Sequence, residues 1–138
     1  MSELELLCSA HYHRFAGRKA ECVRRRIEKT APDREELSSC LFITCLGTSE
    51  PLDVVEVLLE HGADPDYLVD SGYSAFQHAC RNGDLPKVML LYRYGAYLDL
   101  LSSRGESPVY LARMGKCNDV LEFLLQHGAE TDLEPKPR

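Results

Sequence analysis

Apolar residues recur at helical spacing along most of the chain, and from residue 51 onward the whole pattern repeats every 33 residues. The dipeptide Gly-Ala marks this period at 62–63, 95–96 and 128–129. Six further columns, meaning sets of positions one period apart, keep the same register: Val55, Val88 and Leu121; Leu58, Leu91 and Leu124; Asp66, Asp99 and Asp132; Gly72 and Gly105; Ser74 and Ser107; Ala79 and Ala112. Such a period indicates a repeat protein whose units pack on one another.

The residue types within one period predict two helices and a turn. Residues 52–61 place apolar side chains at helical spacing with charges on the outer side, and Gly62 suits a left-handed helix end. An extended stretch then leads to a turn at 70–72, after which Ser74 can cap a second helix. Ala79 is small enough for the two helices to approach closely. One such period cannot bury its apolar face alone.

These motifs resemble the ankyrin-repeat family, whose repeat reads roughly Gly-x-Thr-Pro-Leu-His-x-Ala, followed by Val-x-x-Leu-Leu-x-x-Gly-Ala. The first motif appears at 72–79 and 105–112, and the second at 55–63 and 121–129. Here Ala75 replaces the usual Pro of one copy, while Gln77 and Tyr110 replace the usual His. We expect these departures to weaken the hydrogen bonds at the helix starts without changing the fold.

The resemblance implies an all-α ankyrin-repeat solenoid of helix-turn-helix units joined by β-hairpin-like finger loops. We expect a single domain over residues 1–133, followed by a disordered tail at 134–138 that holds two prolines. The four units expected within the domain are about 3–33, 34–66, 67–99 and 100–133.

The repeat pattern is fainter upstream of residue 51. Residues 40–50 fit a first helix if one residue is inserted before Pro51, which puts Cys45 in the place of Ala79. Residues 20–29 fit a second helix, and residues 4–15 would form its partner. Degenerate terminal units are typical of repeat proteins, because one face of each meets water.

The resemblance also implies that a ligand binds the concave face formed by the fingers and the first helices. The candidate residues in the second finger are Tyr67, Leu68, Asp70, Ser71 and Tyr73, with Arg81 and Asn82 on the helix behind it. Those in the third finger are Leu101, Ser103, Arg104 and Glu106, with Met114 behind it. Large apolar residues at 67–69 and 97–101 favour a protein interface. Alternatively, these residues join adjacent fingers together, Leu98 and Leu100 above all.

Charge is distributed unevenly along the chain. Residues 1–34 hold eight Lys/Arg against five Asp/Glu, whereas residues 35–138 hold eight against seventeen. The basic part could bind phosphate or an acidic peptide, or it could be a solvated helix face. The acidity of the rest disfavours nucleic acid as the main ligand.

No apolar run is long enough to span a membrane, and the acidic start of the chain lacks the pattern of a secretory signal. We therefore predict an intracellular protein, cytoplasmic and/or nuclear, with no membrane contact. The six cysteines lie mostly within helix-like apolar segments, which favours free thiols over disulfides: Cys8, Cys22, Cys40, Cys45, Cys80 and Cys117.

Residue types that could carry chemistry are present but poorly arranged. Cys8, His11 and His13 lack a fourth ligand at a recognisable spacing, so we expect no metal. A thiol–imidazole pair of Cys40 or Cys45 with His61 or His78 is disfavoured, because the register makes Cys45 a core residue. His61 and His127 fit helix-end positions. No phosphate loop or nucleophile motif occurs, so we predict neither an enzyme nor a cofactor.

The sequence thus predicts a non-catalytic protein–protein interaction module, an adaptor or regulatory subunit that binds one or more proteins and is a monomer on its own. Two alternatives stay open. One is a regulator, inhibitor or activator, of a protein kinase complex, and the other is the ankyrin segment of a larger scaffold.

Overall fold

The computed structural model describes residues 19–46 and 52–129. Within these residues the chain forms seven helices and no strand: α2 (Lys19–Thr30), α3 (Arg34–Leu46), α4 (Leu52–Glu60), α5 (Ala75–Asn82), α6 (Leu85–Arg93), α7 (Pro108–Met114) and α8 (Asn118–Gln126). This confirms the all-α prediction. The helix expected at 4–15, the insertion before Pro51 and the tail at 134–138 lie outside the described residues.

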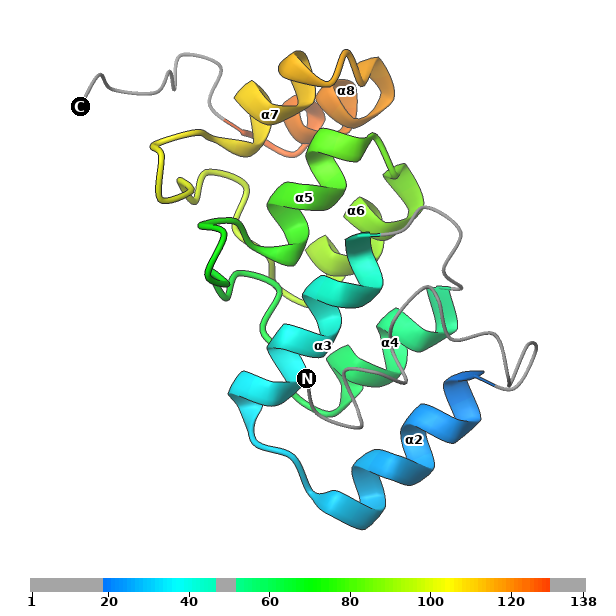
Figure 1. Ribbon diagram of the computed structural model, residues 1–138. Coiled ribbons are helices and arrows are strands. Elements are labelled where there is room, and N and C mark those ends of the chain that lie inside the picture. The colour runs from blue at the N-terminus through cyan, green and yellow to red at the C-terminus, as the bar shows by residue number, and fades with distance from the viewer. Residues whose placement is uncertain (1–18, 47–51, 130–138) are drawn as a thin grey trace.

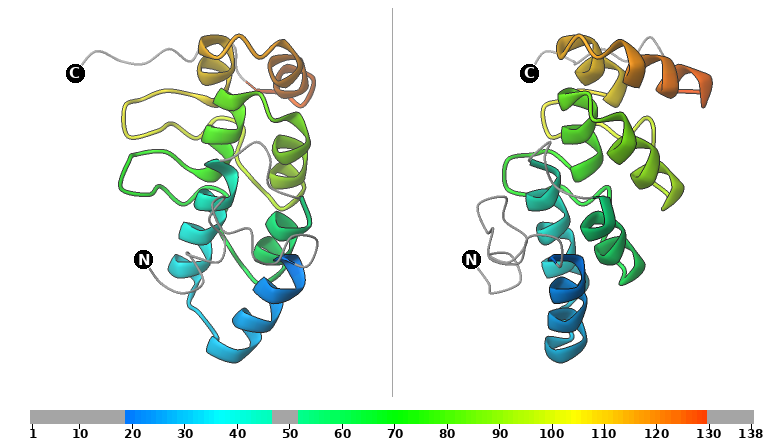
Figure 2. Two further views of the ribbon diagram at one scale, coloured as in Figure 1. Left: turned by 45° about the vertical axis from the view of Figure 1, so that its right-hand side comes forward. Right: turned by 90° about the vertical axis from the view of Figure 1, so that its right-hand side faces the viewer.

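The helices stack in two rows (Figure 1). The inner row is α3, α5 and α7, and the outer row is α2, α4, α6 and α8, with each helix contacting its neighbours in the same row. Within each antiparallel pair, α3 contacts α4, α5 contacts α6, and α7 contacts α8. The loops after α4 and α6 project as fingers on the side of the inner row (Figure 2). The division into four units stays a prediction, because most of the first one is not described.

The periodic columns form the core between the two rows. Leu58, Leu91 and Leu124 are completely buried, at 0% exposure each. Ala79 and Ala112 of the inner row are also fully buried, as their small size predicts. Burying a leucine side chain contributes roughly 1.5–3 kcal/mol, so each unit that adds a leucine to this column adds to the driving force for stacking.

Helix α3 begins earlier than the sequence pattern predicts. It starts at Arg34 rather than near residue 40, because Asp33 caps it: the Glu36 N–H donates to Asp33 Oδ1 at 2.8 Å. The next residues, Arg-Glu-Glu-Leu, favour a helix, and the two acids complement the positive end of its dipole. Cys45 is buried near the other end of this helix, as expected.

The predicted weakening of the helix start at Gln77 is wrong. The Gln77 N–H donates to Ser74 Oγ at 3.1 Å, and the Ser74 N–H donates to Gln77 Oε1 at 3.0 Å. Gln77 Nε2 also donates to the carbonyl of Leu100 in the next finger, at 2.9 Å. A side-chain amide supplies both an acceptor and two donors, so Gln77 caps α5 and fixes the finger that follows it.

A lysine occupies one apolar column. Val54 and Val120 are completely buried at this position, and Lys87, between them in the stack, is only 1% exposed. Its ammonium group lies 3.2 Å from Asp84 Oδ2, and the other oxygen of Asp84 accepts the Lys87 N–H at the start of α6. Asp84 therefore neutralises a buried charge and caps a helix at the same time.

This arrangement predicts opposite outcomes for the two halves of the pair. Lys87→Met should change the free energy of unfolding by no more than about 1 kcal/mol, because Asp84 keeps its favourable place at a helix start. Asp84→Ala should lower it by about 3–5 kcal/mol, because it leaves a buried ammonium group without its carboxylate. Urea unfolding measures both, and a larger loss for Lys87→Met would show that the lysine itself stabilises the core.

Candidate protein-binding face

Each finger closes on itself through hairpin-like backbone hydrogen bonds. In the second finger (residues 61–74), the Val69 N–H donates to Tyr73 O at 3.0 Å and the Gly72 N–H to Val69 O at 2.8 Å. The third finger (residues 94–107) repeats both bonds one period later, between Ser102 and Glu106 and between Gly105 and Ser102. The two tips therefore have the same shape, and equivalent side chains project from equivalent positions.

The two fingers are also bonded to each other. The Ser103 N–H donates to Gly72 O at 3.0 Å, and the Tyr73 hydroxyl donates to Glu106 Oε1 at 2.6 Å. A Cβ atom on Gly72 would lie only 2.9 Å from that of Ser103, so the close approach requires glycine there. Bonds of this kind hold the fingers as a preformed, rigid surface.

Nine of the twelve candidate residues are exposed: Leu68, Asp70, Ser71, Arg81, Asn82, Leu101, Ser103, Arg104 and Met114. The apolar ones among them are Leu68 at 38%, Leu101 at 40% and Met114 at 60%. Leu68 and Leu101 occupy one column, and Arg81 and Met114 occupy another. Eight of the nine exposed candidates thus form four equivalent pairs, one member from each unit, whereas Asn82 aligns with Gly115.

The other three candidates are half-buried and hydrogen-bonded within the chain. Tyr73 and Glu106 bind each other, and the Tyr67 hydroxyl donates to Glu35 Oε1 on α3 at 3.1 Å. The pKa of Tyr73 is raised mainly by its hydrogen bond to Glu106, and the pKa of Tyr67 is raised mainly by its hydrogen bond to Glu35. These three residues hold the fingers in place as well as lining them. Sequence spacing gave no sign of these bonds.

Leu98 and Leu100 are half-buried, and Leu98 packs against the core. Their partial burial favours a structural role over contact with a partner, while the expectation that they join adjacent fingers stays a prediction. On the inner row, the rings of Phe42 of α3 and His78 of α5 lie 5.5 Å apart, a contact that sequence spacing did not indicate. Burial, with the charges of Arg81 and Lys87, lowers the pKa of His78, so it is neutral at physiological pH.

Two of the described thiols, those of Cys45 and Cys80, are poorly suited to catalysis. Burial raises the pKa of Cys45 to about 12, and burial also raises the pKa of Cys80. Both are therefore protonated at neutral pH and weak nucleophiles. His61 and His127 lie at helix ends, where each Nδ1 contacts a carbonyl at 2.8 Å.

In the described part of the chain, no group of three or more His, Cys, Asp or Glu side chains is placed to hold a metal ion. Cys8, His11 and His13 lie outside this part. None of the described helices is long and apolar enough to cross a membrane.

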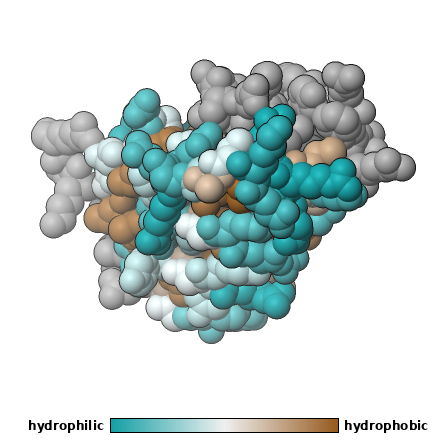
Figure 3. Space-filling view, turned by 90° about the horizontal axis from the view of Figure 1, so that it is seen from below, coloured by the Kyte–Doolittle hydropathy of each residue, from teal (hydrophilic) through white to brown (hydrophobic). Residues whose placement is uncertain are grey.

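The basic segment is partly neutralised by acidic side chains where it is described. Arg24 pairs with Glu60 of α4 at 3.2 Å, and Arg25 pairs with Glu21 one turn earlier on α2. Viewed from the α2 end of the stack, most of the coloured surface is hydrophilic and the hydrophobic patches are separate (Figure 3). This favours a solvated helix face over a phosphate site.

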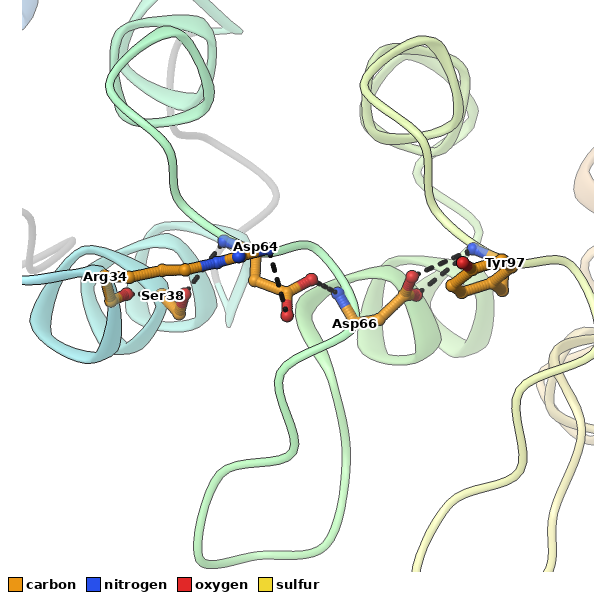
Figure 4. A network of polar contacts seen from close by, with 5 residues as sticks. All are labelled: Arg34, Ser38, Asp64, Asp66 and Tyr97. Atoms are coloured by element: carbon orange, nitrogen blue, oxygen red, sulfur yellow. Dashed lines mark hydrogen bonds and ion pairs between the residues drawn. The ribbon is translucent and has the colours of Figure 1, made fainter.

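A polar network crosses the finger bases (Figure 4). Asp64, Asp66 and Tyr97 also line a cavity of about 670 Å³. The Asp64 N–H donates to Ser38 Oγ at 2.8 Å, and the Asp66 N–H donates to Asp64 Oδ1 at 2.9 Å. The Tyr97 N–H then donates to both oxygens of Asp66, at 3.1 and 3.2 Å. One chain of bonds thus connects α3, the second finger and the third finger.

Burial raises the pKa of Asp66 from 3.8 to about 6; the Tyr97 N–H opposes this rise and the Asp64 carboxylate adds to it. Between these pH values the folded chain binds more protons than the unfolded one, so the stability that this group contributes is lost as the pH rises.

The free energy of unfolding of the native chain should therefore fall, relative to that of Asp66→Asn, as the pH rises from about 4 to about 6.5. The amide oxygen of this variant can still accept the hydrogen bond from the Tyr97 N–H. Chemical denaturation of both proteins across this range tests the sign, and a constant difference would contradict it.

Comparison with known proteins agrees with this geometry. The family model described as Ankyrin repeats (3 copies) matches residues 41–134. An ankyrin repeat protein of fowlpox virus is 29% identical over 83 residues, which cover 59% of this chain and 20% of the viral protein.

Two mammalian relatives are somewhat more similar. The mouse B-cell lymphoma 3 protein homolog is 34% identical over 87 residues, covering 62% of this chain and 19% of its own length. The rat cyclin-dependent kinase 4 inhibitor B is 36% identical over 80 residues, covering 57% of this chain and 60% of its own. The matched region thus spans about a fifth of the first two relatives and less than two thirds of the third.

Proposed function

Because this chain belongs to the ankyrin-repeat family, we propose that it acts as a non-catalytic adaptor or regulatory subunit that binds a protein on the face formed by its fingers and inner helices. Ankyrin repeats mediate protein–protein interactions and are generally not catalytic. The observation that carries the proposal is the pair of exposed leucines, Leu68 and Leu101, at equivalent positions of two interlocked fingers.

The composition of this face supports a protein ligand. Leu68, Leu101 and Met114 offer apolar side chains to a partner, while Asp70 and Arg104 supply charges of both signs beside them. An apolar centre with a polar rim is typical of protein interfaces. Since the fingers are already held by backbone and side-chain bonds, little conformational entropy is lost when a partner binds. The site of action is cytoplasmic and/or nuclear.

The proposal predicts a selective loss of partner binding. Leu68→Ser with Leu101→Ser and Arg104→Ala should weaken capture of a protein from cell extract by about tenfold or more, because buried interface anchors often contribute at least about 2 kcal/mol. The melting temperature should change little, because all three side chains are exposed. Pull-down with quantitative mass spectrometry measures the recovery.

Met89→Ser is the control, because Met89 is similarly exposed but lies on the outer helix α6. A partner kept by the native chain and this control, and lost by the finger variant, would support the proposal. Equal recovery by all three would move the binding site away from the fingers.

A more specific candidate is a regulator of a protein kinase complex. It is favoured by the 36% identity to the rat cyclin-dependent kinase 4 inhibitor B, although the match covers 60% of that protein. A second candidate is an ankyrin segment of a larger scaffold, which is favoured by the greater length of the fowlpox and mouse relatives.

The kinase candidate predicts that this chain changes the phosphorylation rate of a kinase complex with which it co-purifies. The rate should change with increasing native chain and stay constant with the Leu68→Ser, Leu101→Ser, Arg104→Ala variant. Radiolabel transfer to a protein substrate measures it. A purified complex whose rate is the same with and without the chain would remove this candidate and leave the adaptor proposal intact.

A further inference from the structure

The cavity of about 670 Å³ at the finger bases is separate from the exposed leucines of the fingers. Its lining residues come from three segments: 32–37 at the start of α3, 59–66 at the end of α4 and the start of the second finger, and 94–97 directly after α6. Figure 4 shows four of them in one row, Arg34, Asp64, Asp66 and Tyr97. The cavity thus lies where the outer helices end and the fingers begin.

Two helices direct their C-terminal ends at this cavity. The residues that directly follow α4 and α6, at 61–62 and 94–95, line it. The last carbonyl groups of a helix carry a partial negative charge, which favours a cation. Helix α3 begins here with its positive end, but that end is already complemented by the cap Asp33 and by two glutamates in its first turn. The helix ends therefore leave a local preference for positive charge.

One carboxylate of the cavity has no cationic partner among the described residues. Asp64 is paired with Arg34 at 3.7 Å. The two oxygens of Asp66 instead accept the Tyr97 N–H, and no described basic side chain forms an ion pair with them. Each carboxylate oxygen has two lone pairs, so both can accept a further donor. Burial raises the pKa of Asp66 because no nearby cation offsets it.

The other walls of the cavity suit a flat cation on an aliphatic stem. Leu37, Leu59 and Ala63 are buried and supply apolar surface, while Tyr94 and Tyr97 are exposed and supply aromatic side chains. A guanidinium group stacks on aromatic rings and is more weakly hydrated than an ammonium group. Its planar fork of N–H donors also matches the two oxygens of a carboxylate. An arginine side chain therefore fits these residues better than a lysine side chain does.

The charge around the cavity favours the same ligand. Desolvation, followed by the charges of Glu56 and Glu60 of α4, raises the pKa of Tyr94, and Arg93 opposes this rise. The chain as a whole has a formal net charge of −6, and a negative field attracts cations and repels anions. Arg34 is a cation that lines the cavity, but its side chain is 74% exposed, so solvent screens much of its charge.

We propose that this cavity binds the guanidinium group of an arginine side chain of a protein partner. The guanidinium fork donates to the two oxygens of Asp66, the plane of the group lies against the tyrosines, and the aliphatic stem packs on the leucines. The site uses neither Leu68 nor Leu101, so it goes beyond the proposed function. It also gives the partner a defined chemistry, namely an arginine that reaches the finger bases.

NMR titration of the isotope-labelled chain with Nα-acetyl-arginine amide tests the proposal. Backbone amide signals within residues 61–66 and 94–97 should shift saturably at millimolar concentrations of this probe. Nα-acetyl-citrulline amide has nearly the same shape without the charge and should cause no saturable shift. Nα-acetyl-lysine amide should bind at least about threefold more weakly, because its ammonium group is compact and strongly hydrated.

Variants should change the affinity for the arginine probe in opposite directions. Asp66→Asn should weaken binding by about tenfold or more, because it removes the charge while its amide oxygen can still accept from the Tyr97 N–H. Arg34→Gln should strengthen binding by about twofold or more, because it removes a competing cation. Asp99→Asn is the matched control, since Asp99 occupies the same column one unit later and does not line the cavity. Circular dichroism melts verify the folding of all three.

A proton on Asp66 should compete with the ligand. Because its pKa is about 6, about nine tenths of the free molecules carry this proton at about pH 5, and the affinity should fall about tenfold between about pH 7.5 and about pH 5. The other charged and titratable groups at the cavity are Asp64, Arg34, His61 and the two tyrosines. A proton on His61 would also repel a cation, so the same titration of His61→Gln separates the two groups. The dependence on pH should remain in this variant.

Other results would overturn the proposal. The absence of a saturable shift with the arginine probe, or equal shifts with the citrulline probe, would show that a guanidinium charge is not recognised. Equally tight binding of the lysine probe would exclude specificity for guanidinium. Free arginine that binds more than about tenfold tighter than the amide probe would assign the cavity to a small guanidino compound. Loss of the pH dependence in His61→Gln would remove Asp66 from the site.

This site and the finger face can fail independently. The Leu68→Ser, Leu101→Ser, Arg104→Ala variant should bind the arginine probe as the native chain does, because none of these residues lines the cavity. Weaker binding of the probe by this variant would contradict a separate site. A saturable shift with the probe would stand even if protein capture did not depend on the fingers.

Discussion

Every feature of this chain depends on stacking one helix pair against the next. A single pair has apolar residues on two sides and can bury only one of them within itself, so the column of Leu58, Leu91 and Leu124 forms one continuous core only when the units are in register. The glycines and small alanines of each period serve this register, because they set the helix ends and the approach between rows.

Polar links between units follow the same period. Tyr73 reaches Glu106, and Asp66 reaches the backbone of Tyr97, in each case across 31 to 33 residues of sequence. These bonds are short in space because stacking brings equivalent segments side by side. They turn two loops, which would otherwise be mobile, into a firm surface on which exposed side chains have fixed places. The function we propose uses this rigidity directly.

Two charged groups lie where the pattern would place apolar or exposed ones. Lys87 occupies a valine column and is neutralised by Asp84, while Asp66 is buried deeply enough for its pKa to rise to about 6. The lysine is not needed for stacking, since Val54 and Val120 fill its column in the adjacent units. Lys87 makes the stability of the fold depend on one neighbour, Asp84, and Asp66 makes it depend on pH. The leucine core depends on neither.

The sequence by itself determined the family, the all-α architecture and the core. Periodicity, helix caps and small residues are local properties of the chain that recur with the 33-residue period. The columns of Leu58 and Ala79 could therefore be assigned to the core from the sequence. It also predicted that Leu68, Leu101 and Met114 are exposed. The tertiary structure alone decided that Tyr73 binds Glu106, that Gln77 bridges to Leu100, and that Lys87 is buried. Those outcomes depend on which atoms of different units or turns meet within about 3 Å, and a linear pattern carries no such distances.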